Sequence, residues 1–395
     1  MDRRTLLKAA GLAPFALLRA GSLFASPSAG AKLLIVFLRG GYDAANLLVP
    51  VSSPFYYESR PNIAVARPGS DANAAISLDS DWGLHPALAA SILPLYEAKQ
   101  VAFVPFAGTE DLSRSHFETQ DSIELGQPLG THRDFQSGFL NRLVGAMSEH
   151  HGMSFTDQLP LIFRGDMEVP NMALRTLAKP GVDARQSEII REMYRGTRLE
   201  ARVSEGFNVR DAVMRDMAGE MEAANRNAIT TRGFELEARR VAKLMGEKYD
   251  VGFIDVGGWD THVGEGGGAG YLATRLEELG RGLAGFADAM GAGWRDTVVV
   301  VISEFGRTFR ENGNRGTDHG LGTVYWVLGG GIRGGSIAGE QARVERGTLL
   351  QDRDYPVLNE YRAILAGLAS RMFGLDEARL QGVFPGVKAR DLRLI

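Results

Sequence analysis

The chain has 395 residues, 44% of them hydrophobic and 23% charged, a composition that excludes wholesale disorder. It contains no cysteine, which excludes disulfides, thiolate metal ligands and cysteine nucleophiles. The formal net charge is −4, so no basic excess indicates a nucleic-acid partner.

The first 31 residues are typical of a bacterial export signal. Arg3-Arg4 precedes a short apolar run over residues 9–18, and small residues then lead to Ala31. Paired arginines, an apolar stretch too short to span a bilayer and an A-x-A cleavage site are typical of the twin-arginine (Tat) route. We therefore predict cleavage after Ala31 or Ala25, recognition by the Tat export machinery, a periplasmic or secreted mature chain, and no membrane span after cleavage. The alternative is a buried N-terminal helix.

Five apolar runs predict strands buried on both faces of a sheet. They span residues 32–38, 101–106, 251–256, 297–302 and 324–328. Between them, helical patterns span residues 86–98, 115–125, 271–290 and 360–373. Alternating strands and helices predict an α/β fold with a mostly parallel sheet, in which ligands bind at the carboxyl ends of the strands.

One stretch departs from this alternation. Residues 165–250 are polar, charged and helix-prone, with few strand signals. We predict that they form a helical insertion or cap within a single α/β domain of residues 32–395.

Carboxylates and histidines gather at the predicted strand ends. Reading along the chain, the candidates are Arg39, Asp43, Ser115, His116, Asp255, Asp260, His262, Glu304, Arg307, Asp318 and His319. Carboxylates and imidazoles without thiols are the ligand set of zinc, manganese, calcium or magnesium. Several such loops on one sheet edge predict a divalent metal site there.

Some of these residues also have a purely structural interpretation. Ser115 and Glu118 match the capping box S-x-x-E, which opens a helix without implying chemistry. A serine at a helix N-terminus is equally well placed to act as a nucleophile. Arg39 and Arg307 are either surface ion pairs or clamps for a tetrahedral oxyanion.

Five ordered motifs resemble the bacterial family known as domain of unknown function 1501. They are Leu38-Arg-Gly-Gly-Tyr-Asp43, Arg114-Ser-His-Phe117, Gly258-Trp-Asp-Thr-His262, Ser303-Glu-Phe-Gly-Arg-Thr308 and Gly316-Thr-Asp-His-Gly320. That family is similar to the alkaline phosphatase and sulfatase superfamily, whose members hydrolyse or transfer phosphate and sulfate esters at a metal site. The resemblance implies an alkaline-phosphatase-like fold and an exported metal-dependent hydrolase of such esters, on small molecules or polymers.

The resemblance also implies roles for single residues. Ser115 stands where the superfamily has its nucleophile, with His116 beside it, and Arg39 and Arg307 would stabilise charge on the ester. The implied metal ligands are Asp43, Asp255, Asp260, His262, Glu304, Asp318 and His319. Phe305 stands where the superfamily has a further histidine, so we expect one metal ion or an altered pair.

Two other classes of function stay open. The chain is alternatively a non-catalytic exported binding or assembly protein on the same scaffold, which the phenylalanine at position 305 favours. It is also compatible with a metal enzyme of another reaction type, such as a phosphomutase or a lyase.

Overall fold

The computed structural model describes residues 30–147, 150–174, 184–208 and 233–395. Almost all of the predicted export signal lies outside the described residues. The strands are β1 (Lys32–Leu38), β2 (Leu48–Val49), β3 (Ile76–Ser77), β4 (Gly83–Leu84), β5 (Val101–Gly108), β6 (Gly152–Ser154), β7 (Val251–Val256), β8 (Thr297–Ser303), β9 (Thr323–Gly329), β10 (Ser336–Ile337) and β11 (Asn359–Glu360).

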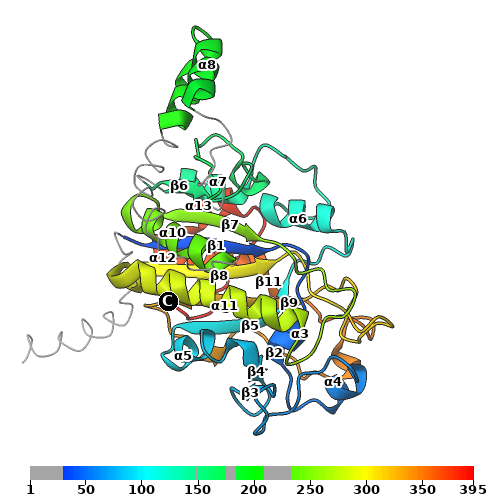
Figure 1. The fold of residues 1–395 in the computed structure, drawn as a ribbon. Coiled ribbons are helices and arrows are strands. Elements are labelled where there is room, and N and C mark those ends of the chain that lie inside the picture. Colours follow the sequence, from blue (N-terminus) through cyan, green and yellow to red (C-terminus); the bar gives the residue numbers. More distant parts are fainter. Residues whose placement is uncertain (1–29, 148–149, 175–183, 209–232) are drawn as a thin grey trace, which may run out of the picture.

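The helices lie between these strands, mostly in alternation with them (Figure 1). The α-helices are α3 (Ala44–Leu47), α4 (Pro54–Ser59), α5 (Ile92–Glu97), α6 (His116–Leu125), α7 (Phe139–Ala146), α8 (Ala184–Tyr194), α10 (Phe234–Glu247), α11 (Tyr271–Met290), α12 (Tyr361–Phe373) and α13 (Glu377–Val383). Short 3-10 turns are η1 (Pro86–Leu88), η2 (Leu161–Phe163), η3 (Gly291–Asp296) and η4 (Arg346–Thr348).

The strands and most helices predicted from the sequence are confirmed. All five apolar runs form strands, and helices α6, α11 and α12 lie where the helical patterns predict them. The pattern over residues 86–98 is instead divided into η1 and α5. Pro94 explains the break, because it has no N–H and is tolerated only in the first turn of a helix. Helix α5 accordingly begins at Ile92, two residues before it.

The central sheet is mainly parallel, which confirms the predicted fold class. Its strand order is β10-β5-β9-β8-β1-β7-β6, with β11 also paired to β5. Strand β9 alone runs antiparallel to its neighbours β5 and β8, whereas the other pairs in this sheet are parallel. Because of this reversal, the beginning of β9 lies at the edge where β5 and β8 end. Strands β2, β4 and β3 form a separate small antiparallel sheet.

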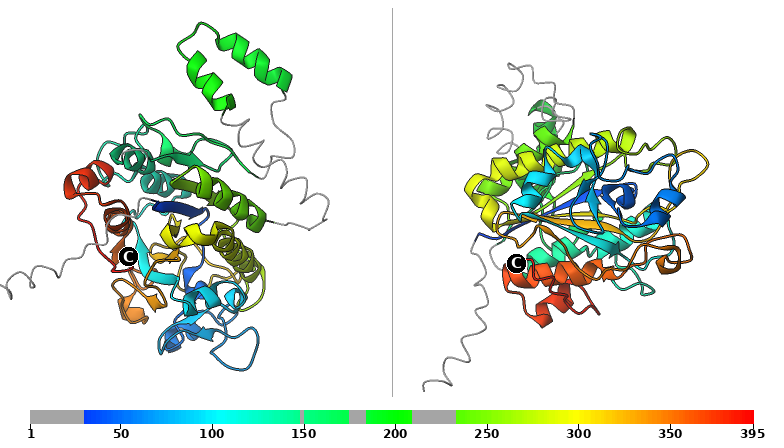
Figure 2. Two further views of the ribbon diagram at one scale, coloured as in Figure 1. Left: turned by 90° about the vertical axis from the view of Figure 1, so that its left-hand side faces the viewer. Right: turned by 90° about the horizontal axis from the view of Figure 1, so that it is seen from below.

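Helices cover both faces of the central sheet (Figure 2). Along β1, Leu34, Val36 and Leu38 join one core, and the intervening residues join the other. The first core packs beneath α5, α10 and α11, and the second beneath α7, α12 and α13. Burial on both faces explains why the strands are continuous apolar runs.

The predicted insertion at residues 165–250 divides into two described parts. Helix α8 projects from the body of the molecule (Figure 1), whereas α10 packs against α11 and β7. The packed face of α10 carries Phe234, Ala238 and Val241 at helical spacing. Helix α10 therefore belongs to the layer of helices that covers one face of the central sheet. Residues 175–183 and 209–232 lie outside the described part of the chain.

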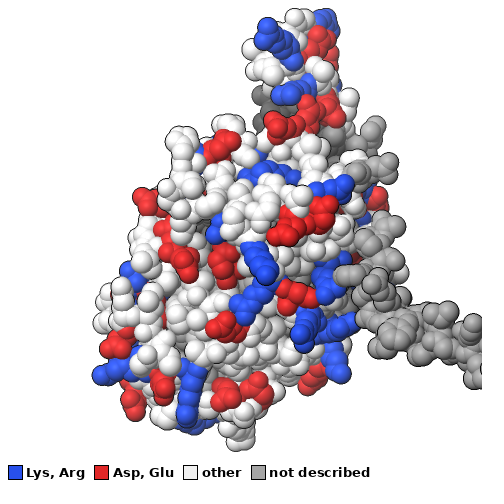
Figure 3. All heavy atoms as spheres, turned by 180° about the vertical axis from the view of Figure 1, so that it is seen from behind, with Lys and Arg blue, Asp and Glu red and all other residues white. Residues whose placement is uncertain are grey.

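Among the described residues, none of the helices combines the length and the apolar character needed to cross a bilayer. Acidic and basic side chains are interspersed over the face that Figure 3 shows. This mixture agrees with the small net charge of −4.

Candidate metal centre

His116 is the first residue of helix α6 and follows a loop, residues 109–115, that is held by several hydrogen bonds. Arg114 in that loop has a φ of +50°, in the left-handed region that side chains rarely adopt. Its guanidinium donates to the Asp354 carboxylate from Nε at 3.0 Å and from Nη2 at 2.7 Å. Asp111 accepts a hydrogen bond from the Ser113 backbone N–H at 3.0 Å. These contacts hold the start of α6 in one place.

Glu304, at the end of β8, accepts a hydrogen bond from His116. The distance from His116 Nδ1 to Glu304 Oε1 is 2.8 Å. The same oxygen accepts from the Gly40 backbone N–H and from Gln120 Nε2, each at 2.8 Å. Gln120 lies one turn beyond His116 on α6, so both side chains reach Glu304 from the same helix face. The Glu304 side chain is fully buried.

His319 reaches the centre because β9 is antiparallel. The connection from β8 to β9 folds back on itself, and Arg307 pairs with His319 across it. The Gly320 N–H donates to the Gly306 carbonyl at 2.9 Å, and the Thr308 N–H donates to that of Asp318 at 2.8 Å. His319 therefore lies at the carboxyl edge of the sheet.

The loop after β7 supplies Asp260 and His262. It lies against the β8–β9 connection, where the Thr317 N–H donates to the Thr261 carbonyl at 3.0 Å. A Cβ atom at Gly316 would lie 2.4 Å from the carbonyl carbon of His262, so only glycine permits this approach. The loop after β7 and the β8–β9 connection are thus in direct backbone contact.

Arg307 orients the Asp260 carboxylate. Its Nη1 donates to Asp260 Oδ1 at 2.6 Å, and its Nε donates to Thr317 Oγ1 at 3.2 Å. The Arg307 side chain is fully buried, and Nη2 also donates to the Thr317 carbonyl. Because the described contacts already engage the guanidinium, Arg307 is placed to hold Asp260 in position.

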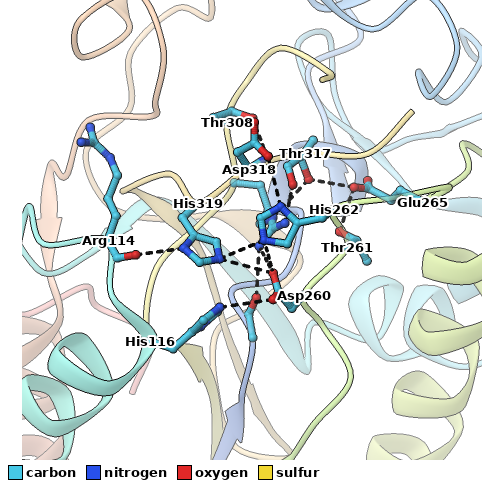
Figure 4. A network of polar contacts seen from close by, with 12 residues as sticks. Arg114, His116, Asp260, Thr261, His262, Glu265, Thr308, Thr317, Asp318 and His319 are labelled. Atoms are coloured by element: carbon cyan, nitrogen blue, oxygen red, sulfur yellow. Dashed lines mark hydrogen bonds and ion pairs between the residues drawn. The ribbon is translucent and has the colours of Figure 1, made fainter. Parts of the chain in front are cut away.

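Four side chains converge at the centre of this arrangement (Figure 4). His116, Asp260 and His319 each offer a ligand atom, and these atoms lie within 4.8 Å of one another. Asp260 Oδ1 lies 3.0 Å from His262 Nε2 and 3.4 Å from His319 Nε2. Asp260 Oδ2 lies 3.5 Å from His116 Nε2, and the two other Nε2 atoms are 3.1 Å apart. Ligands around a tetrahedral zinc ion, with bonds near 2 Å, are separated by about 3.3 Å.

The hydrogen bonds made by the Nδ1 atoms of the three histidines determine which ring nitrogens face the centre of the cluster. Each Nδ1 has an oxygen acceptor: Glu304 for His116, Asp318 at 3.1 Å for His262, and the Arg114 carbonyl at 2.9 Å for His319. An oxygen that can only accept places the proton on Nδ1, so each neutral ring presents its Nε2 lone pair to the centre. Two such lone pairs 3.1 Å apart repel each other unless a proton or a cation lies between them.

The atom His116 Nε2 is buried and has no hydrogen-bond partner. A buried polar atom without a partner is unusual in a folded protein and needs an explanation. Histidines that bind a metal through one nitrogen usually donate from the other to a carboxylate or a carbonyl. The residues present therefore fit a divalent cation.

Electrostatics favour an ionised Asp260 and a neutral His319, whereas the hydrogen bond to Glu304 raises the pKa of His116, whose ring loses a proton when it binds a cation. Burial alone would raise the pKa of Asp260, but the Arg307 guanidinium and the nearby imidazoles hold it below its ordinary value. Burial also opposes ionisation of Glu304, yet hydrogen bonds from His116 and Gln120 lower its pKa. Burial lowers the pKa of His319. At neutral pH the centre therefore offers an ionised carboxylate and a neutral His319 ring.

The structure brings Arg39 and Asp255 together, outside this cluster. Arg39 Nε donates to Asp255 Oδ2 at 2.6 Å, and Nη2 lies 2.9 Å from Glu124 Oε1. Arg39 Nη1 donates to Gln120 Oε1 at 2.9 Å. Among the described contacts, Arg39 reaches the cluster only through Gln120, which in turn donates to Glu304.

Asp43 is not brought into the cluster either. It is 1% exposed and forms an ion pair with Arg60, a fully buried arginine. Burial alone would raise the pKa of Asp43, but the Arg60 guanidinium and hydrogen bonds outweigh burial and lower it. Asp43 also caps helix α3 by accepting from the Ala45 N–H at 3.2 Å.

Ser115 is the N-cap residue of α6, but its side chain makes no capping hydrogen bond. The capping box that the sequence suggests is therefore not formed. Among the described contacts, the Ser115 hydroxyl has no hydrogen bond, and the residue directly precedes His116. The first-turn N–H groups of α6 likewise have no partner within the helix.

Several supporting residues were not identified from the sequence. Gln120 had a detectable signal, because it lies four residues after His116 on a predicted helix. For Arg60, Glu265 and Asp354, the sequence does not show the distant partners that give them their roles, which are Asp43, Thr317 and Arg114 respectively.

Comparison with solved structures finds remote similarities. Ps i-CgsB in complex with k-i-k-neocarrahexaose is 8% identical, with a TM-score of 0.37 over 92% of this chain and 75% of that chain. A protein of the alkaline phosphatase superfamily from Vibrio parahaemolyticus is 11% identical, with a TM-score of 0.36 over 84% of this chain and 69% of that chain. The function proposed below rests on the geometry of the site.

Among curated proteins, none matches this sequence. The family described as "Protein of unknown function (DUF1501)" matches residues 31–384. This match begins where the predicted export signal ends, and it includes all four converging side chains. It confirms the resemblance noted in the sequence, and the chain belongs to the DUF1501 family.

Proposed function

We propose that this protein is an exported metal-dependent hydrolase of phosphate or sulfate esters. The observation that carries the proposal is the inward convergence of three imidazole Nε2 atoms on Asp260, while each Nδ1 is bound to an outer oxygen acceptor. Export is supported by the arginine pair and the apolar run that precede Ala31.

The donor set favours zinc or manganese over calcium. Imidazole suits zinc and other transition metals, whereas calcium takes oxygen ligands. His116, Asp260 and His319 would hold the ion, with His262 as a fourth ligand. A divalent cation bound there would act as a Lewis acid on an ester oxygen and lower the pKa of a coordinated water or hydroxyl.

The remaining groups of the chain have defined parts in this reaction. The Ser115 hydroxyl makes no capping hydrogen bond and lies at the N-terminus of α6, where the helix dipole favours a negatively charged attacking oxygen. The free first-turn N–H groups of α6 would bind non-bridging oxygens of a tetrahedral ester. Arg307 keeps Asp260 aligned and adds positive charge behind it.

A second candidate is a metal-bound protein that binds its ligand without hydrolysis. The observation that favours it is Phe305, whose ring centroid lies 4.9 Å from that of His116 and 5.0 Å from that of His319. This apolar ring occupies space beside the cluster that a further ligand would otherwise fill.

Metal content is the first test of the proposed function. The protein is purified without chelator, and bound metals are measured by elemental mass spectrometry in the wild type, Asp260→Ala and His319→Ala. We expect zinc or manganese in the wild type and its loss in both variants. His132→Ala, outside the cluster, is the matched control. A wild type without metal, folded and unaffected by chelation, would overturn the proposal.

Activity separates the two candidates. The metal-loaded protein is assayed with phosphate monoesters, phosphate diesters and sulfate esters. Turnover that disappears in Asp260→Ala supports the hydrolase. Bound metal without turnover of any of these esters would rule out the hydrolase and leave the binding protein or a metal enzyme of another reaction type.

A further inference from the structure

We propose that Asp354 is a positioning residue of the metal centre: it holds Arg114 and Arg353 so that both grip His319. This inference rests on the proposed metal site, which it extends to residues that do not contact the ion. The three residues Arg114, Arg353 and Asp354 are referred to below as the His319 clamp.

The clamp is centred on a buried carboxylate. The Asp354 side chain is fully buried and lies between the two guanidinium groups. Arg114 donates to Asp354 Oδ2 from Nε at 3.0 Å and from Nη2 at 2.7 Å. Arg353 Nη1 donates to the same carboxylate at 3.0 and 2.9 Å. A buried charge bound by two cations at such distances fixes all three side chains.

Both arginines also contact His319, at different atoms. The Arg114 carbonyl accepts from His319 Nδ1 at 2.9 Å, as Figure 4 shows. The Nη2 of Arg353 donates to the His319 backbone carbonyl at 2.8 Å. The clamp therefore holds the backbone of His319 from one side and determines the direction of its ring from the other.

The backbone at Arg114 explains why a clamp is needed. Its φ of +50° is disfavoured for a residue with a Cβ atom and persists only when the surroundings hold it. If Asp354 did not bind its side chain, Arg114 would relax to negative φ and turn its carbonyl away from His319. Gln351 and Asp352, both with φ of +56°, form the tight turn that presents Arg353 and Asp354.

The consequence for His319 concerns its tautomer. With a carbonyl acceptor at Nδ1, the neutral ring carries its proton there and offers Nε2 to the ion. Without this acceptor, both tautomers are populated, and the ring is free to rotate. Loss of such an outer hydrogen bond typically lowers metal affinity by about 10–100-fold.

The test compares two substitutions of Arg114 in the full mature chain. Arg114→Ala and Arg114→Gly remove the same side chain and the same ion pair, but only glycine adopts positive φ without strain. Zinc affinity is measured by titration of the metal-free protein. We expect Arg114→Ala to bind zinc about 10–100-fold more weakly than the wild type, with Arg114→Gly recovering a clear part of that loss. Equal affinities of the two variants would overturn the proposal.

A second variant and a spectroscopic measurement complete the experiment. In Asp354→Asn, we expect weaker zinc binding and a mixed tautomer of His319, observed by nitrogen-15 NMR of the histidine rings. Asp391→Asn breaks another aspartate pair, with Arg371, and is the control for loss of an ion pair. An unchanged His319 tautomer in Asp354→Asn would refute the clamp. If the wild type binds no zinc, the proposed function fails, and the tautomer measurement still decides on the clamp.

Discussion

Glu265 offers a sharp test of the electrostatics beside the candidate metal centre. Its fully buried side chain accepts hydrogen bonds at Oε2 from Thr261 Oγ1 and Thr317 Oγ1, each at 2.8 Å. Burial and the negative charge of Asp43 raise the pKa of Glu265 well above its ordinary value of 4.5. Glu265 therefore keeps its proton at pH values where a free glutamate has lost it, and its carboxyl group hydrogen-bonds to the Asp43 carboxylate.

Replacing Glu265 by glutamine should preserve this network. The amide group would donate to Asp43, and the amide oxygen would accept from both threonines. We expect Glu265→Gln to change the free energy of unfolding by less than about 1 kcal/mol at pH 4, where Glu265 is protonated in the folded chain. Glu265→Ala leaves Asp43, Thr261 and Thr317 without this partner. Asp43 keeps Arg60 and the Ala45 N–H as partners, so the two threonine hydroxyls are the groups left unsatisfied. At about 1–3 kcal/mol for each of them, the substitution should cost at least about 2 kcal/mol at the same pH.

The pH dependence of stability follows from the raised pKa. Well below pH 4.5, Glu265 is protonated in both the folded and the unfolded chain, so its contribution to stability is fully present. As the pH rises toward the folded-state pKa, only the unfolded chain releases the proton, and stability is lost. Glutamine does not titrate, so Glu265→Gln should gain stability relative to the wild type as the pH rises above 4.5.

Urea denaturation of the metal-free protein, followed by circular dichroism from pH 4 to pH 8, measures these differences. Chelator in every sample separates folding from metal binding. The reasoning would be refuted if Glu265→Gln lost as much stability as Glu265→Ala at pH 4. That result would mean that Glu265 is ionised in the folded protein.

Three further predictions concern the centre itself. Ser115→Ala should leave the melting temperature and the metal content unchanged, because the Ser115 hydroxyl makes no capping hydrogen bond. The same variant should lose hydrolysis if Ser115 is the nucleophile, whereas full activity would show that water attacks the ester. Arg307→Ala should lower zinc affinity about 10–100-fold in a titration, since Asp260 loses its 2.6 Å partner; an unchanged affinity would contradict this role. Zinc at 100 times its dissociation constant should stabilise the wild type by about 2.7 kcal/mol over the chelated protein in urea denaturation, and this gain should vanish in Asp260→Ala.

Much of the fold could be predicted from the sequence because burial on both faces leaves a simple pattern. Continuous apolar runs marked the five long strands, and the helix at residues 271–290 was predicted with its observed bounds. The direction of β9 could not be predicted, because an apolar run has the same pattern in a parallel or an antiparallel strand. That direction nevertheless brings His319 to the edge where the other strands end.

The candidate site was predictable as a set of loops, but not in its pairings. Asp43 and Asp260 are both acids after a strand, and only the structure shows that Arg60 neutralises the first while the second faces the histidines. Likewise, the acceptor at His319 Nδ1 is a backbone carbonyl, which leaves no residue-type signal.

The hairpin that joins β8 and β9 has a consequence for how the centre assembles during folding. Its pairs, such as Val298 with Gly329, are close in the sequence, whereas β1 must reach β8 across most of the chain, as in the pair Lys32–Thr297. Local contacts cost less loop-closure entropy and generally form earlier. His319 would then take its place early, and His116 and Asp260 would join it only when distant segments dock. The proposed metal uptake would therefore occur at the last stage of folding, and its rate would report when the fully folded protein has formed.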